Sequence, residues 1–441
     1  MTRDAISRAL VFVGALVLAV LYGAASMTLD LFPRDQVTWF FRSLTEVRSE
    51  LAGQRRSALS IPGSGPRIAH AEPDRMAPGL TFVTRLEDDS LHRLEVIRPD
   101  GDVVHSWQVD WFELIDDDSF LPPARRPQQQ PGASIHGARV LQTGDVVLNF
   151  EFLTTLKLDV CGNLLWAAKN LGHHSIDQTE DGEFWVGGEI YHPSGTTPPY
   201  PNHRAPFHEW TAQRLTKDGA VDGEISMAGL LVDADLLGLL YATNQQNTDP
   251  KTGRDTLHLN DVEMFPSDIE PGVFRPGDLM VSLRNINTVI VFDPETGRIR
   301  HRATGSFLRQ HDPDFIDGNR YILFDNRNLG HAETPLARSR ILEVTASPSG
   351  GVASVQEVYR GPGSPDFYSN VKGRQERLDN GNLLVVSSRD GRILELTPEG
   401  DLVWEYRNQV ADDRRGEITE AQRLTEPLTE TFFEDARARC R

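Results

Sequence analysis

Cysteine, net positive charge and phosphate-binding loops are what this sequence has least of. Its 441 residues include two cysteines, too few for a disulfide scaffold or a zinc site. We favour two free thiols for Cys161 and Cys440, the alternative being a pair that tethers the C-terminal tail. Asp and Glu outnumber Lys and Arg by 64 to 45, which gives a net charge of −19. This acidic surface argues against a nucleic-acid partner, and the sequence has no GxxxxGK[ST] loop for a nucleotide.

One long apolar run lies near the N-terminus. Ala9 to Leu29 carries no charged side chain, and a helix of about 20 apolar residues can span a bilayer. Arg3 and Arg8 precede the run, as they do in an uncleaved signal-anchor. We therefore predict a cytoplasmic tail and transmembrane signal-anchor over residues 1–35, and a juxtamembrane helix with a linker over 36–78. The rest of the chain is expected to be extracytoplasmic, on the periplasmic side of the inner membrane.

The remainder of the chain is repetitive. One signature is an apolar strand, an Asp-Gly or Gly-Asn turn and a second apolar strand, as in LDVCGNLLW (158–166) and LTPEGDLVWEY (396–406). A second signature of strand, glycine turn and buried strand precedes it, as in ARVLQTGDVVLNF (138–150) and DFIDGNRYILF (314–324). Together the two signatures make four antiparallel strands, which is one blade of a β-propeller.

These repeats predict an all-β fold, a six-bladed β-propeller over residues 79–410. We place the blades near 79–110, 133–170, 172–228, 257–305, 310–360 and 368–408. The alternative is a seven-bladed ring, to which the C-terminal tail or part of 229–256 would add strands. The tail itself, residues 411–441, is rich in Glu and Arg and is expected to be helical.

Aligning the repeats on their turn glycines brings a set of histidines into register. His136, His174 and His311 each lie seven or eight residues before the turn glycine of their repeat, and His258 holds the same place in a repeat with an insertion. Equivalent positions of successive blades converge on one mouth of the central channel. We therefore expect these imidazoles to face one small volume.

The strand that leaves each turn returns to the same mouth. Seven residues after the turn glycines stand Glu151, Glu189, Arg284 and Asp325, of which Arg284 is the only cation, and Asn326 and Arg327 follow Asp325. An arginine among histidines in an acidic protein suggests an anion site.

Several interpretations of the histidines remain open at this point. They could be a consensus feature of the repeat that links neighbouring blades structurally. They could hold a metal such as iron, although Arg284 would repel a cation, and we expect no metal. They could also act in nucleophilic catalysis by imidazole.

Three segments resemble the successive blade motifs of the bacterial arylsulfotransferase (aryl-sulfate sulfotransferase) family. They are HHSIDQTEDGEFWVGG, HLNDVEMFP with GDLMVSLRN, and QHDPDF with RYILFDN. The resemblance covers roughly residues 79–408. It implies a periplasmic six-bladed propeller that transfers a sulfuryl group from an aryl sulfate to a phenolic acceptor through a sulfohistidine, with no nucleotide donor and no cofactor.

The resemblance also assigns residues. His311 matches the nucleophile, His258 and His174 its partner histidines, and Arg284 the sulfate-binding arginine, while His136, Asn260, Asn326 and Arg327 are expected to bind substrate. Well-studied members carry an additional N-terminal β domain that helps them dimerise, and its absence here leaves the oligomeric state open. The alternative function is a membrane-tethered propeller that binds a ligand without catalysis.

Overall fold

The computed structural model describes residues 3–29 and 60–440, except 88–91, 130–131, 194, 198–199, 201–202, 204, 206, 243–255 and 329–337. The chain divides into two units, residues 1–58 and 59–441. In the first unit, helix α1 covers Arg3–Leu29. Within the described ranges, we find no helix with both the length and the apolar character needed to cross a membrane. The predicted transmembrane anchor is therefore not supported, and the predicted juxtamembrane helix lies outside the described residues.

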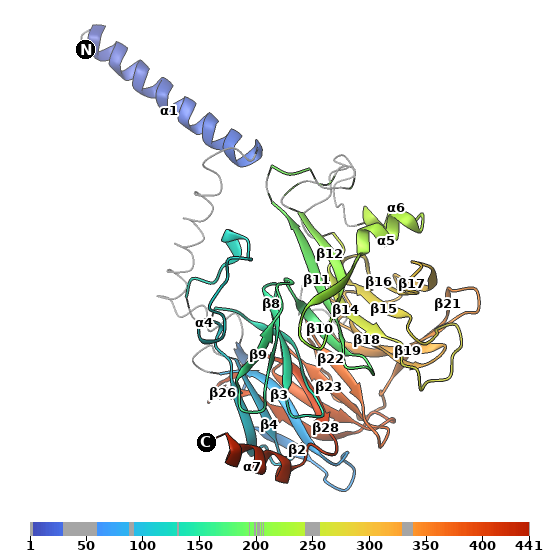
Figure 1. Cartoon of the computed structure of the whole chain (residues 1–441). Helices are drawn as coiled ribbons and strands as arrows, with labels where there is room; N and C mark the ends of the chain where they lie inside the picture. Colours follow the sequence, from blue (N-terminus) through green and yellow to red (C-terminus); the bar gives the residue numbers. More distant parts are fainter. Residues whose placement is uncertain are drawn as a thin grey trace. The chain divides into compact units, whose positions relative to one another are not determined.

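The second unit is built mainly of antiparallel strands. Its described residues form seven sheets, six of which have four or five strands (Figure 1). In three of the six the strand order is β28 (Ile418–Leu424), β3 (Leu80–Leu86), β4 (His92–Ile97), β5 (Val103–Gln108); β6 (Ile135–Val140), β7 (Val146–Phe150), β8 (Thr154–Leu158), β9 (Leu164–Ala167); and β10 (His173–Gln178), β11 (Phe184–His192), β12 (Phe207–Leu215), β13 (Val221–Ser226).

The other three follow the same plan. They are β14 (Leu259–Met264), β15 (Leu279–Leu283), β16 (Thr288–Phe292), β17 (Ile299–Thr304); β18 (His311–Asp317), β19 (Arg320–Asp325), β20 (Arg340–Ala346), β21 (Val352–Val358); and β22 (Arg374–Arg377), β23 (Leu383–Ser387), β24 (Arg392–Leu396), β25 (Leu402–Arg407), β2 (Ile68–Ala71). Each of these six sheets contains one predicted repeat unit, which confirms a mostly β chain of repeated antiparallel sheets.

Shorter elements complete the second unit. They are the three-stranded sheet of β1 (Ser60–Pro62), β27 (Arg414–Gly416) and β26 (Gln409–Ala411), the helices α4 (Trp111–Leu114), α5 (Met227–Asp233), α6 (Leu237–Leu240) and α7 (Glu430–Arg439), and the 3-10 turns η1 (Pro123–Arg125) and η2 (Arg284–Ile286).

The first strands of the six larger sheets contact one another in a cycle. β28 contacts β6, β6 contacts β10, β10 contacts β14, β14 contacts β18, β18 contacts β22, and β22 contacts β28. Polar side chains on these strands accept hydrogen bonds from the backbone of the next first strand. The pairs are Asp177 Oδ2 with Met264 N at 3.0 Å, Glu263 Oε2 with Phe315 N at 3.0 Å, Asp312 Oδ2 with Gln375 N at 2.6 Å, Glu376 Oε2 with Arg423 N at 2.8 Å, and Glu420 Oε1 with Gly137 N at 3.0 Å.

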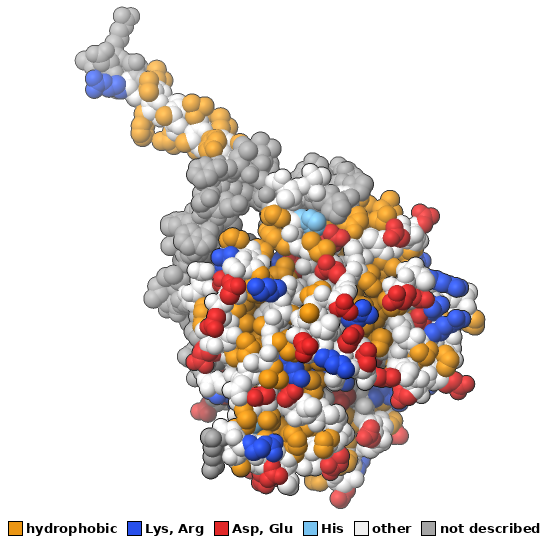
Figure 2. Space-filling view, viewed as in Figure 1, with side chains coloured by type: hydrophobic (Ala, Val, Ile, Leu, Met, Phe, Trp, Pro, Cys, Tyr) orange, Lys and Arg blue, Asp and Glu red, His pale blue; other side chains and the backbone are white. Residues whose placement is uncertain are grey.

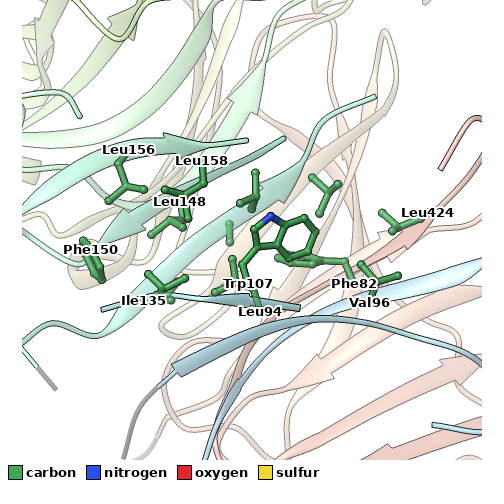
Figure 3. Close-up of a cluster of buried hydrophobic side chains, with 14 of the residues drawn as sticks. Phe82, Leu94, Val96, Trp107, Ile135, Leu148, Phe150, Leu156, Leu158 and Leu424 are labelled. Atoms are coloured by element: carbon green, nitrogen blue, oxygen red, sulfur yellow. The ribbon is translucent and has the colours of Figure 1, made fainter. Parts of the chain in front are cut away.

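Apolar side chains fill the space between neighbouring sheets. Figure 3 shows one such cluster, in which Trp107 and Phe82 from one sheet face Ile135 and Leu148 from the next. These side chains are fully or almost fully buried, and burial of apolar area is the main favourable term in folding. On the surface, acidic and basic side chains are interspersed over the visible face (Figure 2).

The C-terminal tail differs from the predicted helix. Ile418–Leu424 form strand β28, which pairs with β3 so that Ile418 lies opposite Arg85. Only α7 is helical, and its side chain Phe433 stacks on His105 at 5.2 Å between ring centroids. Cys440 forms a disulfide with Cys161, with a Cα–Cα distance of 5.3 Å. The favoured interpretation of two free thiols was therefore wrong, and the tail is tethered.

Candidate active site

The structure brings the four aligned histidines together. His136 and His174 are the second residues of β6 and β10, His311 begins β18, and His258 directly precedes β14. The His174 ring centroid lies 4.0 Å from that of His136, 5.1 Å from His258 and 6.3 Å from His311. All four are buried. We call these residues the histidine cluster.

The backbone of the cluster is shaped by close approaches. His174 and His258 have φ angles of 57° and 52°, a left-handed conformation that non-glycine residues adopt rarely and that often marks functional sites. Gly137 has a φ of 96°, and a Cβ there would lie 1.5 Å from the His174 carbonyl oxygen. A glycine is therefore required beside His136, so that β6 can approach β10.

Asn326 fixes the tautomer of His311. His311 Nδ1 lies 2.6 Å from Asn326 Oδ1 and 3.2 Å from the Arg309 carbonyl oxygen. The Asn326 amide nitrogen donates to the carbonyl oxygens of Lys372 and Ser369, the latter at 2.8 Å, so the amide oxygen must face the imidazole. Both partners of Nδ1 are acceptors, which places the proton on Nδ1 and leaves the lone pair on Nε2.

The His311 imidazole is also neutral. Burial, together with the Arg284 guanidinium, holds the pKa of His311 well below its usual value, although the Asn326 bond opposes this shift. Its Nε2 atom is buried and makes no hydrogen bond with any described residue. A neutral imidazole with a bare Nε2 is the form that can attack an electrophile.

His173 fixes the tautomer of His174 in a similar way. His173 Nε2 lies 3.2 Å from the Gly188 carbonyl oxygen and so donates, which makes its Nδ1 an acceptor. His174 Nδ1 lies 2.8 Å from that atom and is therefore the donor, so His174 Nε2 bears the lone pair. Burial lowers the pKa of His173 to about 3 and, with the charges of His136 and His173, holds the pKa of His174 well below its usual value.

His136 is paired with a carboxylate. Its Nδ1 lies 2.9 Å from Glu151 Oε1. Burial alone would raise the pKa of Glu151, but Lys372 and His136 hold it below the usual value, so Glu151 is ionised. Glu151, His136 and His174 also offer atoms within 4.8 Å of one another that could hold a metal ion. The direct bond from His136 to Glu151 and the charge of Lys372 favour a hydrogen-bonded dyad instead.

Arg284 lies beside the cluster. It begins η2 directly after β15, and its backbone N–H donates to the His258 carbonyl oxygen at 3.0 Å. The side chain is half-buried and close enough to His311 to lower the pKa of that imidazole. Arg284 is therefore placed where a guanidinium could contact an anion near His311.

The remaining predicted residues lie in different places. Asn260 donates from Nδ2 to the Gln310 carbonyl oxygen at 2.7 Å, while its Oδ1 is buried and makes no hydrogen bond with described residues. Asn326 was predicted to bind substrate, but its amide is fully buried and engaged by protein groups, so it positions His311 instead. Arg327 is half-buried, and its side chain makes no hydrogen bond or ion pair with the part of the chain that the structure describes.

Two aromatic side chains next to the cluster were missed in the sequence. Phe152 lies 5.2 Å from His173, 5.9 Å from His174 and 5.9 Å from Trp210, measured between ring centroids. Trp210 lies 4.9 Å from His258. Phe152 has a φ of 61°, but nothing in the sequence marks that conformation. These two rings pack against the histidine cluster and against each other.

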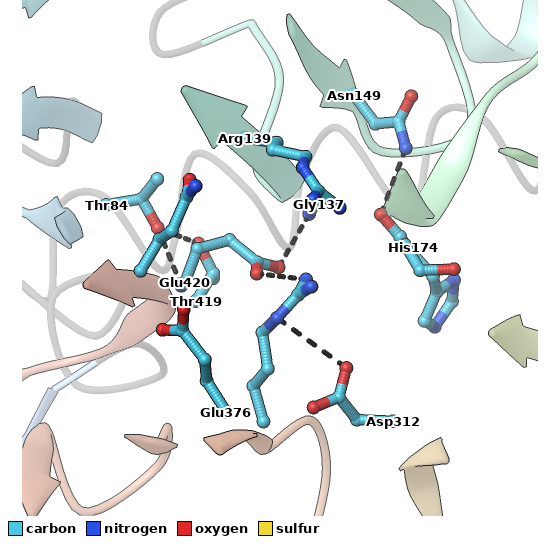
Figure 4. Close-up of polar contacts among 12 residues, drawn as sticks. Thr84, Gly137, Arg139, Asn149, His174, Asp312, Glu376, Thr419 and Glu420 are labelled. Atoms are coloured by element: carbon cyan, nitrogen blue, oxygen red, sulfur yellow. Dashed lines mark hydrogen bonds and ion pairs between the residues drawn. The ribbon is translucent and has the colours of Figure 1, made fainter. Parts of the chain in front are cut away.

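A small cavity of about 20 Å³ adjoins the cluster on its other side. Its walls include His136, His174 and His311, together with Asn260, Asp261, Asp312, Arg374 and Glu420. Arg374 Nη1 donates to Glu420 Oε2 at 2.6 Å, and Arg374 Nε lies 3.6 Å from Asp312 Oδ1. Figure 4 shows Asp312, Glu420 and His174 of this cavity wall. The histidines thus share a cavity with buried carboxyl groups.

The sequence matches the profile of the arylsulfotransferase (ASST) family over residues 137–409, more than half of the chain. A search of curated proteins found no match. Similar solved structures include a protein of unknown function from Bacteroides caccae, at 13% identity and a TM-score of 0.48, covering 79% of this chain and 100% of that chain. Virginiamycin B lyase from Staphylococcus aureus matches at 14% identity and a TM-score of 0.33, over 64% of this chain and 72% of that chain.

TM-scores this low carry no argument about this chain. The family match does, because it spans most of the six larger sheets and includes His174, His258, His311 and Arg284. The chain belongs to the arylsulfotransferase family.

Proposed function

We propose that this protein transfers a sulfuryl group from an aryl sulfate to a phenolic acceptor through a sulfohistidine at His311, without a nucleotide donor. One observation carries the proposal. The His311 imidazole is held neutral by burial, with its proton on Nδ1 and its Nε2 lone pair free of protein partners, beside a guanidinium. A nucleophilic imidazole requires this protonation state.

In the first half-reaction, Nε2 of His311 attacks the sulfur of the aryl sulfate. The N–S bond forms as the bond from sulfur to the phenolic oxygen breaks, and a phenolate leaves. Arg284 offsets negative charge on the sulfuryl oxygens, and one such preorganised donor is worth about 3 kcal/mol in mutational data. In the second half-reaction the acceptor phenol attacks the sulfur, and the His311 imidazole is released, so ping-pong kinetics follow.

The other cluster residues serve binding and proton transfer in this proposal. Phe152 and Trp210 would pack against the aromatic ring of donor or acceptor. His174 Nε2 bears the lone pair and can accept a proton there, and His258, whose ring centroid lies 5.1 Å away, is the second partner histidine in the family resemblance. The His136–Glu151 dyad can stabilise an imidazolium.

We also propose that the six larger sheets are the blades of one closed propeller. The cycle of contacts among the first strands supports this arrangement, and a seventh blade would need strands beyond these sheets. The disulfide between Cys161 and Cys440 supports an extracytoplasmic location for the second unit, because disulfides persist in oxidising compartments.

The test is transfer from a fluorogenic phenyl sulfate to a phenol by the full-length protein. We expect turnover that persists with a chelator and is lost in His311→Ala. His301→Ala is the matched control, since His301 is also buried but lies on the outer strand β17. Enzyme quenched with donor alone should gain about 80 Da, the mass of a sulfuryl group, on the peptide that contains His311.

Other outcomes would point elsewhere. A folded protein that transfers no sulfuryl group from any aryl sulfate would favour a binding module. Turnover that is lost to chelator and restored by a metal ion would favour a metal at His136, Glu151 and His174, the set whose atoms lie within 4.8 Å.

A further inference from the structure

The cavity beside the histidine cluster has the features of a site for one water molecule. Its volume of about 20 Å³ exceeds the roughly 10–15 Å³ that a water needs. Three buried atoms of residues that line it, Asn260 Oδ1, Asp261 Oδ2 and His311 Nε2, make no hydrogen bond with described residues. Buried polar atoms without protein partners usually bind ordered water. The cavity therefore has both the room and the partners for a water between the carboxyl group and the imidazoles, and that water must release His311 Nε2 before this atom attacks sulfur.

Asp261 is the carboxyl group of interest on the cavity wall. It is 4% exposed, and Ser175 of β10 hydrogen-bonds its side chain. The groups that face it from packed strands are Asp177 of β10, Asp312 and Asp314 of β18, Glu263 of its own strand β14, and Arg374 of β22. Burial, and next the charge of Asp312, raise the pKa of Asp261 well above its usual value.

The two other carboxyl groups on the cavity wall already have protein partners. Asp312 accepts a hydrogen bond from the Gln375 N–H at 2.6 Å and faces the Arg374 guanidinium. Glu420 accepts from Gly137 N at 3.0 Å and from Arg374 at 2.6 Å. Of these three carboxyl groups, Asp261 alone has an oxygen without a partner among the described residues.

A proton must be available near the site if the leaving phenolate is to be neutralised. The proposed nucleophile His311 and its neighbour His174 are kept neutral by burial. A neutral imidazole that already uses its N–H in a bond to Asn326 or His173 has no proton to give. A carboxyl group on the cavity wall is a separate source from which the proton can come.

We propose that Asp261 stores this proton and exchanges it with the histidine cluster through one water in the cavity. The inference rests on the proposed sulfuryl transfer. In the first half-reaction the S–O bond breaks as the N–S bond forms, the O–H bond of the Asp261 carboxyl breaks, and its proton passes through the water to Nε2 of His174 and from that atom to the phenolate oxygen. In the second half-reaction the proton of the acceptor phenol returns to the Asp261 carboxylate as the N–S bond breaks. No other reactant is required.

The test compares two donors with Asp261→Asn. A phenyl sulfate releases a basic phenolate that needs the proton, whereas a 4-nitrophenyl sulfate releases a stabilised phenolate that does not. In a ping-pong reaction, kcat/KM for the donor reports the first half-reaction only. We expect Asp261→Asn to lower it about 100-fold for phenyl sulfate and about 5-fold or less for 4-nitrophenyl sulfate, within the range of general acid catalysis.

Asp177→Asn is the matched control. Asp177 is half-buried and accepts a backbone hydrogen bond from Met264 at 3.0 Å, but it does not line the cavity. That variant should change kcat/KM by the same factor for both donors. If the role of Asp261 were purely structural, Asp261→Asn would lower kcat/KM by the same factor for both donors. That result would overturn the inference.

A measurement on the wild-type protein gives an independent readout. One component of the infrared carbonyl absorption of protonated buried carboxyl groups should be lost when His311 is sulfated at pH 7, and the same component should be missing from Asp261→Asn from the start. An unchanged band on sulfation would contradict the proton store while leaving the sulfohistidine intact. A wild-type protein that forms no sulfohistidine and transfers no sulfuryl group would instead overturn the proposed function, and the inference with it.

Discussion

The hydrogen bond from His311 to Asn326 offers a direct way to perturb the proposed nucleophile. Asn326→Ala removes the acceptor that lies 2.6 Å from His311 Nδ1, and the Arg309 carbonyl oxygen at 3.2 Å remains as a weaker partner. Asn326→Asp keeps an oxygen at that place but loses the amide donor to Ser369 and Lys372. The two variants therefore separate the tautomer of His311 from the stability of the surrounding loop.

The expected loss in Asn326→Ala follows from the strength of one buried hydrogen bond. Removing a partner from a buried donor costs about 1–3 kcal/mol, and about 1.4 kcal/mol corresponds to tenfold in rate. The bond to Arg309 retains part of the preference for the Nδ1–H tautomer, so we expect kcat/KM to fall about tenfold to hundredfold. The population of the Nε2–H tautomer should rise, which nitrogen NMR of ¹⁵N-histidine-labelled protein can detect.

Asn326→Asp should behave differently. A carboxylate accepts from Nδ1–H and stabilises the imidazolium, so the pKa of His311 should rise from its low wild-type value. The acid limb of the kcat/KM profile should move to higher pH, while activity above pH 8 stays within a few-fold of wild type, on the order of 3-fold. Thermal unfolding should show a less stable protein, because two carbonyl oxygens lose their donor.

Three results would refute this reasoning. They are full kcat/KM in a folded Asn326→Ala variant, an unshifted acid limb in Asn326→Asp, and an Nε2–H tautomer of His311 in the wild type.

Two further predictions concern stability. Burial raises the pKa of Glu376 to about 7 from 4.5, so between these pH values the folded state holds a proton that the unfolded state releases. Stability therefore falls as the pH rises from about 4.5 to about 7 and is level at higher pH. Glu376→Gln should remove this loss and gain about 2 kcal/mol over wild type in denaturant unfolding as the pH is raised from 5 to 8, after allowance for partial solvent access. The exposed Glu399→Gln should show no such gain. The disulfide joins residues 279 positions apart. Cys440→Ser should therefore lower the free energy of unfolding by about 2–4 kcal/mol. An unchanged denaturation midpoint in wild-type protein treated with a reductant would contradict this.

The sheets could be predicted from the sequence because their signals are local. Each repeat carries its own turn glycine and its own alternation of apolar residues, as in Asp317–Gly318–Asn319 between β18 and β19. Strand β28 could not be placed in the same way. It pairs with β3 from the other end of the chain, and the many charged residues of the tail suggested a helix that is present only in α7.

The histidine cluster could be predicted in outline for a related reason. Equivalent repeat positions converge, so register alone brought His136, His174, His258 and His311 to one place. The hydrogen bonds that set their tautomers could not be predicted. The orientation of Asn326 depends on the carbonyl oxygens of Ser369 and Lys372, and no pattern in the sequence connects these residues.

Burial has opposite effects on the pKa of the two kinds of titratable group in and around the site, the imidazoles and the carboxyl groups. It disfavours the charged form of any group, so it lowers the pKa of His174 and His311 and raises the pKa of Asp261, Glu263 and Asp314. Burial therefore favours neutral imidazoles and protonated carboxyl groups in the same small region. In the proposed reaction the imidazoles supply the nucleophile and the base, and Asp261 supplies the acid. A sulfuryl transfer that needs a neutral histidine to attack and a proton for the leaving phenolate can obtain both from the same buried environment.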